Sequence, residues 1–279
     1  MSIPWGILRD IRKLRLAQHR DGCSIGCQTD RADDSRLPWS SDGAYGGWGG
    51  ETHHGTDAQS DRRPVVFVHG NQRDACDWRP HVPFFLQRGY TGDDLWAITF
   101  KEATPSHESM AEQLDAFITN VREHTGADAV DVVSHSLGVT GARYWLTTRA
   151  RYEWVENFVG LAGANHGTVL STWCAETGIK SGAYGSSEFL RYDHDEIADH
   201  PLTRVNEDET PGDIEYYTLR GSEDSLFWRC RDSPTLSGAT NVLLETDHDG
   251  VRIDQRALEY IFQWVSGTHP YDVQHQVSI

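Results

Sequence analysis

The segment SHSLG (134–138) has the residue types and the spacing of a nucleophilic serine. The valine-rich residues before it predict a buried strand and the residues after Gly138 predict a helix, so Ser136 falls at the turn between them. This arrangement is close to the G-x-S-x-G pattern, in which a sharp turn exposes the serine hydroxyl at a helix N-terminus. The strained turn needs small residues two positions before and after the serine. Gly138 meets this need and Ser134, although a departure, is small, so we predict that Ser136 is the nucleophile of an acyl-transfer reaction.

A second motif, PVVFVHGN (64–71), predicts part of the site that would hold the negative charge of this reaction. Acyl transfer passes through a tetrahedral intermediate whose oxyanion needs backbone N–H donors. We expect one donor at Asn71, in the loop after an early strand, and the other at Leu137, directly after the nucleophile. His69 is expected to brace this loop, because the base of such a site follows the serine in the chain.

An acid and a base are expected after two late strands. The segment YYTLRGSEDSLF offers Glu223 and Asp224, and the segment NVLLETDHDGV offers His248 between two aspartates. The chain order Ser136, Asp224, His248 is that of this type of site. Asp224 would orient the imidazole and stabilise its charged form, and His248 would take the serine proton and return it to the leaving alcohol. Glu223 stays the alternative acid, although Asp224 lies deeper in the turn.

His135 and His166 are the other pocket candidates beside His69. We expect His135 to point away from the reacting centre, because neighbouring side chains at a tight turn diverge. His166 follows a predicted strand and is expected to line the pocket. The acid- and histidine-rich segment YDHDEIADH (192–200) could bind calcium or zinc, but a solvated acidic loop is the favoured interpretation. The sequence therefore predicts no metal site.

Buried strands and helices alternate along the chain from Pro64 onward. Strands are predicted at 64–70, 95–100, 129–134, 157–163, 214–221 and 241–246, and helices at 74–90, 107–124, 137–152 and 254–265. The helix at 107–124 carries its apolar residues, Met110, Leu114, Phe117, Ile118 and Val121, on one face. This alternation predicts an α/β fold with a mainly parallel, doubly wound sheet and helices on both faces.

The alternation lapses at three places, which sets the expected domain boundaries. Residues 1–63 form an extension, with an amphipathic helix near its start and then a mostly irregular Gly- and Asp-rich stretch. We expect this helix to dock on the domain, the alternative being contact with an anionic membrane or lipid interface. Residues 64–267 form the catalytic domain, with a polar insertion at about 164–213 that is expected to be a cap or lid. Residues 268–279 form a C-terminal tail.

The charge balance argues against one class of partner. The chain has 42 acidic and 25 basic side chains, a formal net charge of −17. This negative field repels nucleic-acid phosphates, so no nucleic-acid partner is expected. Such an acidic, lysine-poor surface is typical of proteins from salt-adapted cells, in which salt screens the repulsion between carboxylates. We therefore predict a halophilic protein.

Cysteine and hydropathy patterns leave the compartment open. The five cysteines are too few for a disulfide scaffold, and Cys23 with Cys27 is a weak zinc signal against a local disulfide or plain thiols. No apolar run is long enough for a signal peptide or a membrane span. We expect a soluble protein, either cytoplasmic or secreted by a non-standard route.

The quoted motifs, together with FVGLAGANHG, resemble the corresponding segments of α/β-hydrolase lipases of the small bacterial and class 2 type. They are similar as well to those of lipase-like polyhydroxyalkanoate depolymerases. The likeness runs from about Pro64 to Gly267. It implies hydrolysis of carboxylic esters through an acyl-serine, without a cofactor, and it places the family's roles on Ser136, Asp224, His248, Asn71 and Leu137, where Ser134 replaces the more usual Ala or Gly.

The expected activity is therefore that of a lipase or esterase acting on uncharged or apolar acyl esters. A polyhydroxyalkanoate depolymerase with the same triad is the nearest alternative, and a non-catalytic protein that binds a hydrophobic ligand is a more distant one. Peptidase activity also stays open, because a triad alone does not separate amides from esters. A dehalogenase or epoxide hydrolase would carry aspartate in place of Ser136.

Overall fold

A central β-sheet organises the structure, a computed structural model that describes residues 30–55, 62–178 and 185–267. Within these residues, seven strands pair in the order β1-β3-β2-β4-β5-β6-β7. β1 runs antiparallel to β3, and all the other pairs are parallel. The strands are β1 (Tyr45–Gly49), β2 (Val65–Val68), β3 (Leu95–Phe100), β4 (Val130–His135), β5 (Val155–Leu161), β6 (Glu215–Gly221) and β7 (Thr240–Leu244). The predicted α/β class with a mainly parallel sheet is confirmed.

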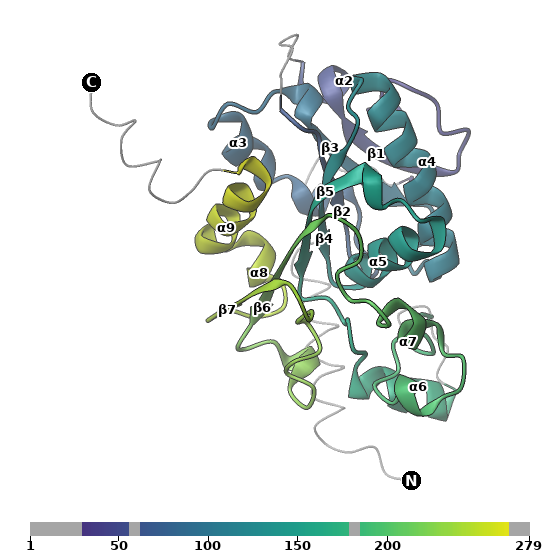
Figure 1. The fold of residues 1–279 in the computed structure, drawn as a ribbon. Coiled ribbons are helices and arrows are strands. Elements are labelled where there is room, and N and C mark those ends of the chain that lie inside the picture. Colours follow the sequence, from purple (N-terminus) through teal and green to yellow (C-terminus); the bar gives the residue numbers. More distant parts are fainter. Residues whose placement is uncertain (1–29, 56–61, 179–184, 268–279) are drawn as a thin grey trace.

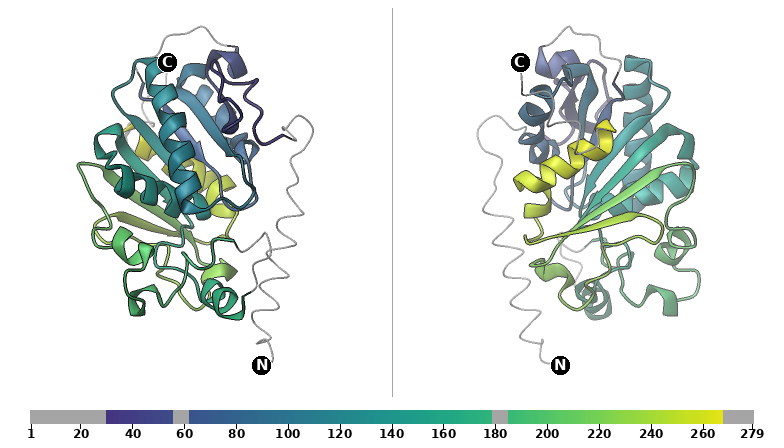
Figure 2. Two further views of the ribbon diagram at one scale, coloured as in Figure 1. Left: turned by 90° about the vertical axis from the view of Figure 1, so that its right-hand side faces the viewer. Right: turned by 60° about the vertical axis from the view of Figure 1, so that its left-hand side comes forward.

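Helices cover both faces of this sheet (Figure 1). On one face lie α4 (His107–Thr125) and α5 (Leu137–Arg149). On the other lie α3 (His81–Leu86) and α9 (Gln255–Ser266), and Figure 2 shows α9 crossing the strands. The shorter helices are α2 (Gly50–His54), α6 (Val169–Thr177), α7 (Pro201–Val205) and α8 (Gly250–Ile253).

The strand β2 shows how the sheet builds two cores. Its side chains alternate between the faces, so Val65 and Phe67 pack with the residues of α3 and α9, and Val66 and Val68 pack with those of α4 and α5. All four are fully buried. A strand that is buried on both faces reads as a continuous apolar run, which is why this segment could be predicted.

The helix α4 forms where its pattern predicted it. Ser106 begins it by accepting a hydrogen bond from the Ser109 N–H at 3.2 Å, and Gly126 ends it in the left-handed conformation with φ 72°. The five apolar residues predicted on one face are all buried. They form much of the core on that side of the sheet.

The strand β1 lies in the stretch before Arg63 that is expected to be mostly irregular. Its sequence YGGWG reads as a loop, because glycine is a poor strand former. The pairing with β3 nevertheless needs these glycines: a Cβ on Gly47 would lie 2.3 Å from the carbonyl oxygen of Ala97, and a Cβ on Gly49 would lie 2.3 Å from the Trp96 ring. The glycines of β1 are therefore explained by the close approach of the β1 and β3 backbones, and not by strand propensity.

The polar insertion at 164–213 also contains more regular structure than its composition predicted. It holds α6, the short α7 and a single helical turn at His194–Glu196. Phe189, Leu202 and Val205 form a small apolar cluster of its own. These elements lie together at one end of the molecule (Figure 1). Whether the insertion acts as a cap or lid stays a prediction.

Several expectations fall outside the described residues. They concern the N-terminal helix, the tail at 268–279, and Cys23 and Cys27. Of the other cysteines, Cys76 is disulfide-bonded, whereas Cys174 and Cys230 are free and buried. In the described part of the chain, no helix has the length and apolar character that crossing a bilayer requires.

Candidate active site

The carboxyl ends of four parallel strands bring the predicted site residues to one edge of the sheet. Asn71 follows β2, Ser136 follows β4, Asp224 follows β6 and His248 follows β7. In a sheet of this kind, ligands bind beside the carboxyl ends of the strands. The topology alone therefore gathers residues that are far apart in the sequence.

Ser136 lies on a strained turn between β4 and α5. Its backbone has φ 55° and ψ −123°, and its N–H donates to the carbonyl oxygen of Leu161 at 2.8 Å. A non-glycine residue held at positive φ costs about 1–3 kcal/mol, so the surrounding contacts must impose this conformation. Its side chain is partly exposed, although the residues on either side are buried.

The neighbours of Ser136 explain why the turn needs small residues. A Cβ on Gly138 would lie 2.5 Å from the carbonyl oxygen of His69 and 3.0 Å from that of Val68. Backbone atoms cannot move aside cheaply, so this position requires glycine. Ser134, the departure from the usual pattern, is fully buried, and its hydroxyl donates to the carbonyl oxygen of Val159 at 3.3 Å. The serine thus fits because its polar atom has a partner.

His248 joins the other two residues of the predicted triad. Its Nδ1 lies 2.7 Å from Oδ2 of Asp224, and its Nε2 lies 2.9 Å from Oγ of Ser136. Because a carboxylate can only accept, Nδ1 carries the proton, which leaves Nε2 to accept from the Ser136 hydroxyl. This is the tautomer that a general base for Ser136 requires.

Asp224, not Glu223, is the acid that contacts His248. The Asp224 side chain is only 2% exposed, and its second oxygen accepts a hydrogen bond from the Leu226 N–H at 2.9 Å. Glu223 is exposed, and its backbone N–H donates to the carbonyl oxygen of Thr246. The turn after β6 therefore directs the two neighbouring carboxylates in different directions.

The charge state of His248 reflects two opposing effects. Burial of the ring lowers the pKa of His248, while the negative charge of Asp224 and the hydrogen bond to it raise that pKa. The raising effects prevail, so the pKa of His248 lies above its ordinary value. The site therefore stabilises the imidazolium that would form when Ser136 loses its proton.

His69 braces the loop that carries Asn71, as predicted. Its Nδ1 donates to the carbonyl oxygen of Gly70 at 2.7 Å, and its Nε2 accepts from the Phe100 N–H at 3.0 Å. Burial, and then the positive charge of Arg31, lower the pKa of His69 to about 3, so the ring stays neutral. At the other expected donor, Leu137 begins α5, where a backbone N–H has no acceptor within its own helix.

His135 does not point away from the site, which corrects the sequence-based expectation. Its Nε2 lies 2.9 Å from the backbone carbonyl oxygen of His248, and the two imidazole rings are 4.9 Å apart. The chain turns sharply at Ser136, so the side chain of His135, at the end of β4, contacts the backbone of the loop after β7. Burial holds the pKa of His135 well below its ordinary value. This ring therefore supports His248 as a neutral hydrogen-bond donor.

His166 contacts the insertion. Its Nε2 lies 3.2 Å from a carboxylate oxygen of Glu209, and its backbone N–H donates to the Ser233 hydroxyl. Neither contact involves a residue of the predicted triad, so a role in lining the substrate pocket stays a prediction.

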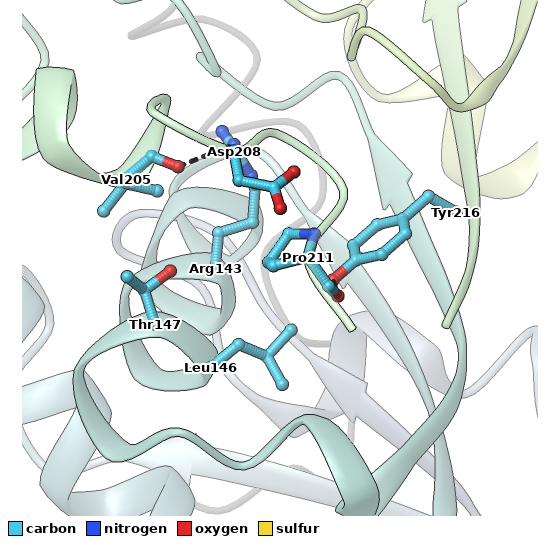
Figure 3. A pocket seen from close by; sticks show the side chains of 7 residues that line it. All are labelled: Arg143, Leu146, Thr147, Val205, Asp208, Pro211 and Tyr216. Atoms are coloured by element: carbon cyan, nitrogen blue, oxygen red, sulfur yellow. Dashed lines mark hydrogen bonds between the residues drawn. The ribbon is translucent and has the colours of Figure 1, made fainter. Parts of the chain in front are cut away.

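Arg143 connects the insertion to α5, the helix that follows Ser136, through hydrogen bonds. From α5 its guanidinium donates to the side chain of Asn206 at 2.9 Å and to the carbonyl oxygen of Val205 at 3.3 Å. Figure 3 shows it beneath Asp208, in a small pocket that Leu146, Thr147, Val205, Pro211 and Tyr216 also line. Ser136 and His248 are not among the lining residues, so this pocket is separate from the predicted triad.

The side chains of the 192–200 segment contact other parts of the protein. Asp193 forms a bidentate ion pair with Arg191, His194 lies 2.9 Å from the hydroxyl of Thr203, and His200 lies 3.0 Å from the carbonyl oxygen of Glu188. In the described parts of the chain, no three histidine, cysteine or acidic side chains are grouped as a metal site would need.

Sequence reasoning missed an ion pair beside the triad. Arg73, two residues after Asn71, forms two 3.0 Å hydrogen bonds with Asp249, the residue after His248. The two residues are 176 positions apart in the sequence, so no local pattern predicts their contact. The sequence shows only that Arg73 lies two residues after Asn71 and that Asp249 directly follows His248.

Residues 62–197 match the family model of the class 2 lipases. Lipase B of Aspergillus fumigatus is similar in structure, with a TM-score of 0.60 and 15% identity, over 88% of this chain and 61% of that one. The propeptide form of the Bacillus licheniformis lipase BlEst2 has a TM-score of 0.59 and 18% identity, over 77% of this chain and 52% of its own. The chain thus spans about half the length of that protein. For the mature form, the TM-score is 0.54 and the identity 20%, over 75% of this chain and 94% of that one.

At these identities the solved structures establish the fold. The fold and the family match over residues 62–197 both agree with the resemblance drawn from the sequence motifs. The chain has the α/β-hydrolase fold, and its residues 62–197 are similar to the class 2 lipases.

Proposed function

We propose that the chain is a serine carboxylic-ester hydrolase that acts on apolar acyl esters through an acyl-serine intermediate. The observation that carries this proposal is the pair of hydrogen bonds made by His248, 2.9 Å to Ser136 and 2.7 Å to Asp224. The match of residues 62–197 to class 2 lipases supports the same reaction. The net charge of −17 favours uncharged over anionic substrates.

In the proposed mechanism, Oγ of Ser136 attacks the ester carbonyl carbon while Nε2 of His248 takes the hydroxyl proton. Asp224 stabilises the resulting imidazolium. The tetrahedral intermediate then collapses, the bond to the leaving oxygen breaks, and the departing alcohol receives the proton from His248. A water molecule, deprotonated by His248, then attacks the acyl carbon. The bond from that carbon to Oγ breaks, His248 returns the proton to Oγ, and the acid is released.

The oxyanion of each intermediate is proposed to accept hydrogen bonds from the backbone N–H groups of Asn71 and Leu137. Two features support this assignment. Leu137 begins α5, whose N-terminus carries partial positive charge. The Asn71 loop is fixed by His69 and by the hydrogen bond from the Gln72 N–H to the carbonyl oxygen of Ala103 at 2.7 Å.

The test is hydrolysis of p-nitrophenyl esters from acetyl to palmitoyl in molar salt, comparing the parent with Ser136→Ala. We expect the variant to keep its circular dichroism spectrum and to lose turnover and labelling by a fluorophosphonate probe. Ser134→Ala is the matched control, because this serine is buried two residues away, and it should still label. A Ser136→Ala protein that hydrolyses esters like the parent would refute the assignment.

The same assay separates the alternatives. The acyl chain length that gives the highest kcat/KM distinguishes an esterase from a lipase. Release of soluble acid from a polyhydroxyalkanoate film would identify the polyester depolymerase. Absence of turnover on every ester, together with absence of probe labelling, would favour the non-catalytic protein that binds a hydrophobic ligand.

A further inference from the structure

Two loops on opposite sides of Ser136 must hold a fixed separation for the proposed reaction. The loop after β2 carries Asn71, and the loop after β7 carries His248. A substrate carbonyl group has to contact the Asn71 N–H while Ser136 remains in reach of His248. The hydrogen bonds of the triad do not set the position of Asn71, so another contact has to relate the two loops.

We propose that the ion pair between Arg73 and Asp249 is a positioning clamp. It holds the loop after β2, here called the oxyanion loop, and the loop after β7, here called the histidine loop, at the separation that catalysis needs. The proposal rests on the hydrolase function above. Arg73 donates to both carboxylate oxygens of Asp249 at 3.0 Å. Both bonds come from Nη2, and Nη1 lies 3.7 Å from a carboxylate oxygen of Asp77, so the two terminal nitrogens face two carboxylates and the orientation of the guanidinium is set.

The clamp is largely removed from solvent. The exposed fraction of the side chain is 12% for Arg73 and 14% for Asp249. Exposed ion pairs contribute little and tolerate movement, whereas loss of one partner from a desolvated pair leaves an uncompensated charge. The geometry of this pair is therefore more strongly held than that of a surface ion pair.

A second, deeper pair supports the first. Asp77 lies 3.7 Å from Arg73 and 3.8 Å from Arg252, and Arg252 also lies 3.7 Å from Asp249. Arg252 additionally donates to the backbone carbonyl oxygen of Asp77. Two cations and two anions thus alternate around a ring, with Asp77 and Arg252 less than a tenth exposed. Each carboxylate touches both guanidinium groups.

The backbone on the Arg73 side of the clamp is constrained. Arg31 donates to the carbonyl oxygen of Arg73 at 2.7 Å and to that of Phe100 at 2.8 Å, which ties the oxyanion loop to β3. The Arg73 N–H donates to the carbonyl oxygen of Gly70 at 3.2 Å and closes the turn around Asn71. A shift of the Arg73 side chain would therefore be passed to Asn71.

The clamp predicts a signature that an ion pair acting only through its charges would not give, namely a loss of activity on removal of either partner although the His248 pKa moves in opposite directions. The charges facing His248 are Asp224 after β6, Asp249 on its own loop and Arg73 on the oxyanion loop, with neutral His135 beneath it. Asp249 raises the pKa of His248 and Arg73 lowers it. Removing either partner opens the same clamp, but the two removals move this pKa in opposite directions.

The experiment compares Arg73→Gln and Asp249→Asn with the parent. We expect kcat/KM to fall about tenfold to a hundredfold in each, because a displacement of about 1 Å at a reacting centre can cost that much. The pKa of His248, followed by NMR titration of its imidazole, should rise in Arg73→Gln and fall in Asp249→Asn. The double variant should lose little more activity than either single one, because the pair acts as a unit.

Two control variants test whether the effects are specific to the clamp. Arg151→Gln breaks an ion pair distant from His248, to Asp115, and should leave both kcat/KM and the His248 titration unchanged. Arg73→Lys keeps the charge but has one nitrogen in place of the two that face Asp249 and Asp77, so it should fold even if Arg73→Gln does not, and it should regain only part of the activity. Parent-like kcat/KM in Arg73→Gln or Arg73→Lys, or additive losses in the double variant, would overturn the clamp.

A readout that needs no hydrolysis separates this proposal from the proposed function. In Asp249→Asn, the backbone amide resonance of Asn71 should shift and its hydrogen exchange should quicken, although the substitution lies on the other loop. If the parent hydrolyses no ester but this response is seen, the function fails and the clamp stands. If the parent hydrolyses esters and the Asn71 amide does not respond, the function stands and the clamp fails.

Discussion

His135 Nε2 lies 2.9 Å from the backbone carbonyl oxygen of His248. The residue before the proposed nucleophile thus supports the residue that would activate it. Burial of His135 lowers its pKa and keeps its ring neutral. The contact joins β4 to the loop after β7 without placing a second charge beside His248.

Replacing His135 by leucine tests this support. Loss of one buried hydrogen bond costs about 1–1.5 kcal/mol, which corresponds to about a tenfold fall in kcat/KM if the loop loses its productive position. Steady-state kinetics on a p-nitrophenyl ester measure the effect. His107→Leu is the matched control, because that buried ring hydrogen-bonds to the Thr140 hydroxyl instead. Equal rates for the His135 variant and the parent would contradict the prediction.

Replacing Asp224 by asparagine tests the choice between the two neighbouring acids. We expect kcat to fall by about 10⁴, because an amide does not hold the imidazole in the required tautomer. Glu223→Gln should change kcat less than twofold, since Glu223 is exposed and the 2.7 Å contact with His248 belongs to Asp224. A larger loss in the Glu223 variant than in the Asp224 variant would reverse the assignment.

The pH dependence of kcat/KM reports the charge of His248. Only the neutral imidazole can accept the Ser136 proton, so activity should rise as the pH rises through the pKa of His248. Because Asp224 raises this pKa, the midpoint of the acidic limb should lie above about 6.5, the ordinary value for histidine. The midpoint is read from a pH profile of the parent in constant ionic strength. A midpoint well below that value would contradict the prediction.

The elements and residues that the sequence predicted depend on local patterns, and those it missed depend on distant contacts. The sharp turn at Ser136 could be predicted, because a strand, small residues and a helix follow one another within a few positions. The glycine-rich β1 could not, because its reason lies in the backbone of Ala97. The position of His135 was predicted wrongly, because the direction of its side chain is set by the carbonyl group of His248, 113 residues away.

The acidic composition predicts that salt stabilises the fold. A net charge of −17 repels itself, and raising the salt concentration from 0.1 to 1 M shortens the screening length from about 10 Å to about 3 Å. The midpoint of thermal unfolding should therefore rise between these concentrations. Sucrose, which carries no charge, is the control for effects of the cosolute on water. An unfolding temperature that falls with added NaCl would contradict a salt-adapted surface.

Buried histidines predict a loss of stability in mild acid. Burial, chiefly, lowers the pKa of His69, His81 and His107 to about 3, against about 6.5 in an unfolded chain. Below pH 6.5 the unfolded state therefore binds more protons than the folded state. The stability is fully present above that pH and is lost as the pH falls, by about 1.4 kcal/mol per pH unit for each histidine.

His81→Phe isolates one of these contributions. The His81 ring packs against the rings of Phe67 and Trp78, at centroid distances of 5.5 and 4.9 Å, so a phenyl ring can take its place among aromatic neighbours. Urea unfolding between pH 7.5 and 5 should show a weaker dependence of the unfolding free energy on pH in this variant, by the contribution of one proton. An unchanged slope would mean that His81 takes up its proton without unfolding, and the low pKa assigned to its buried ring would then be wrong.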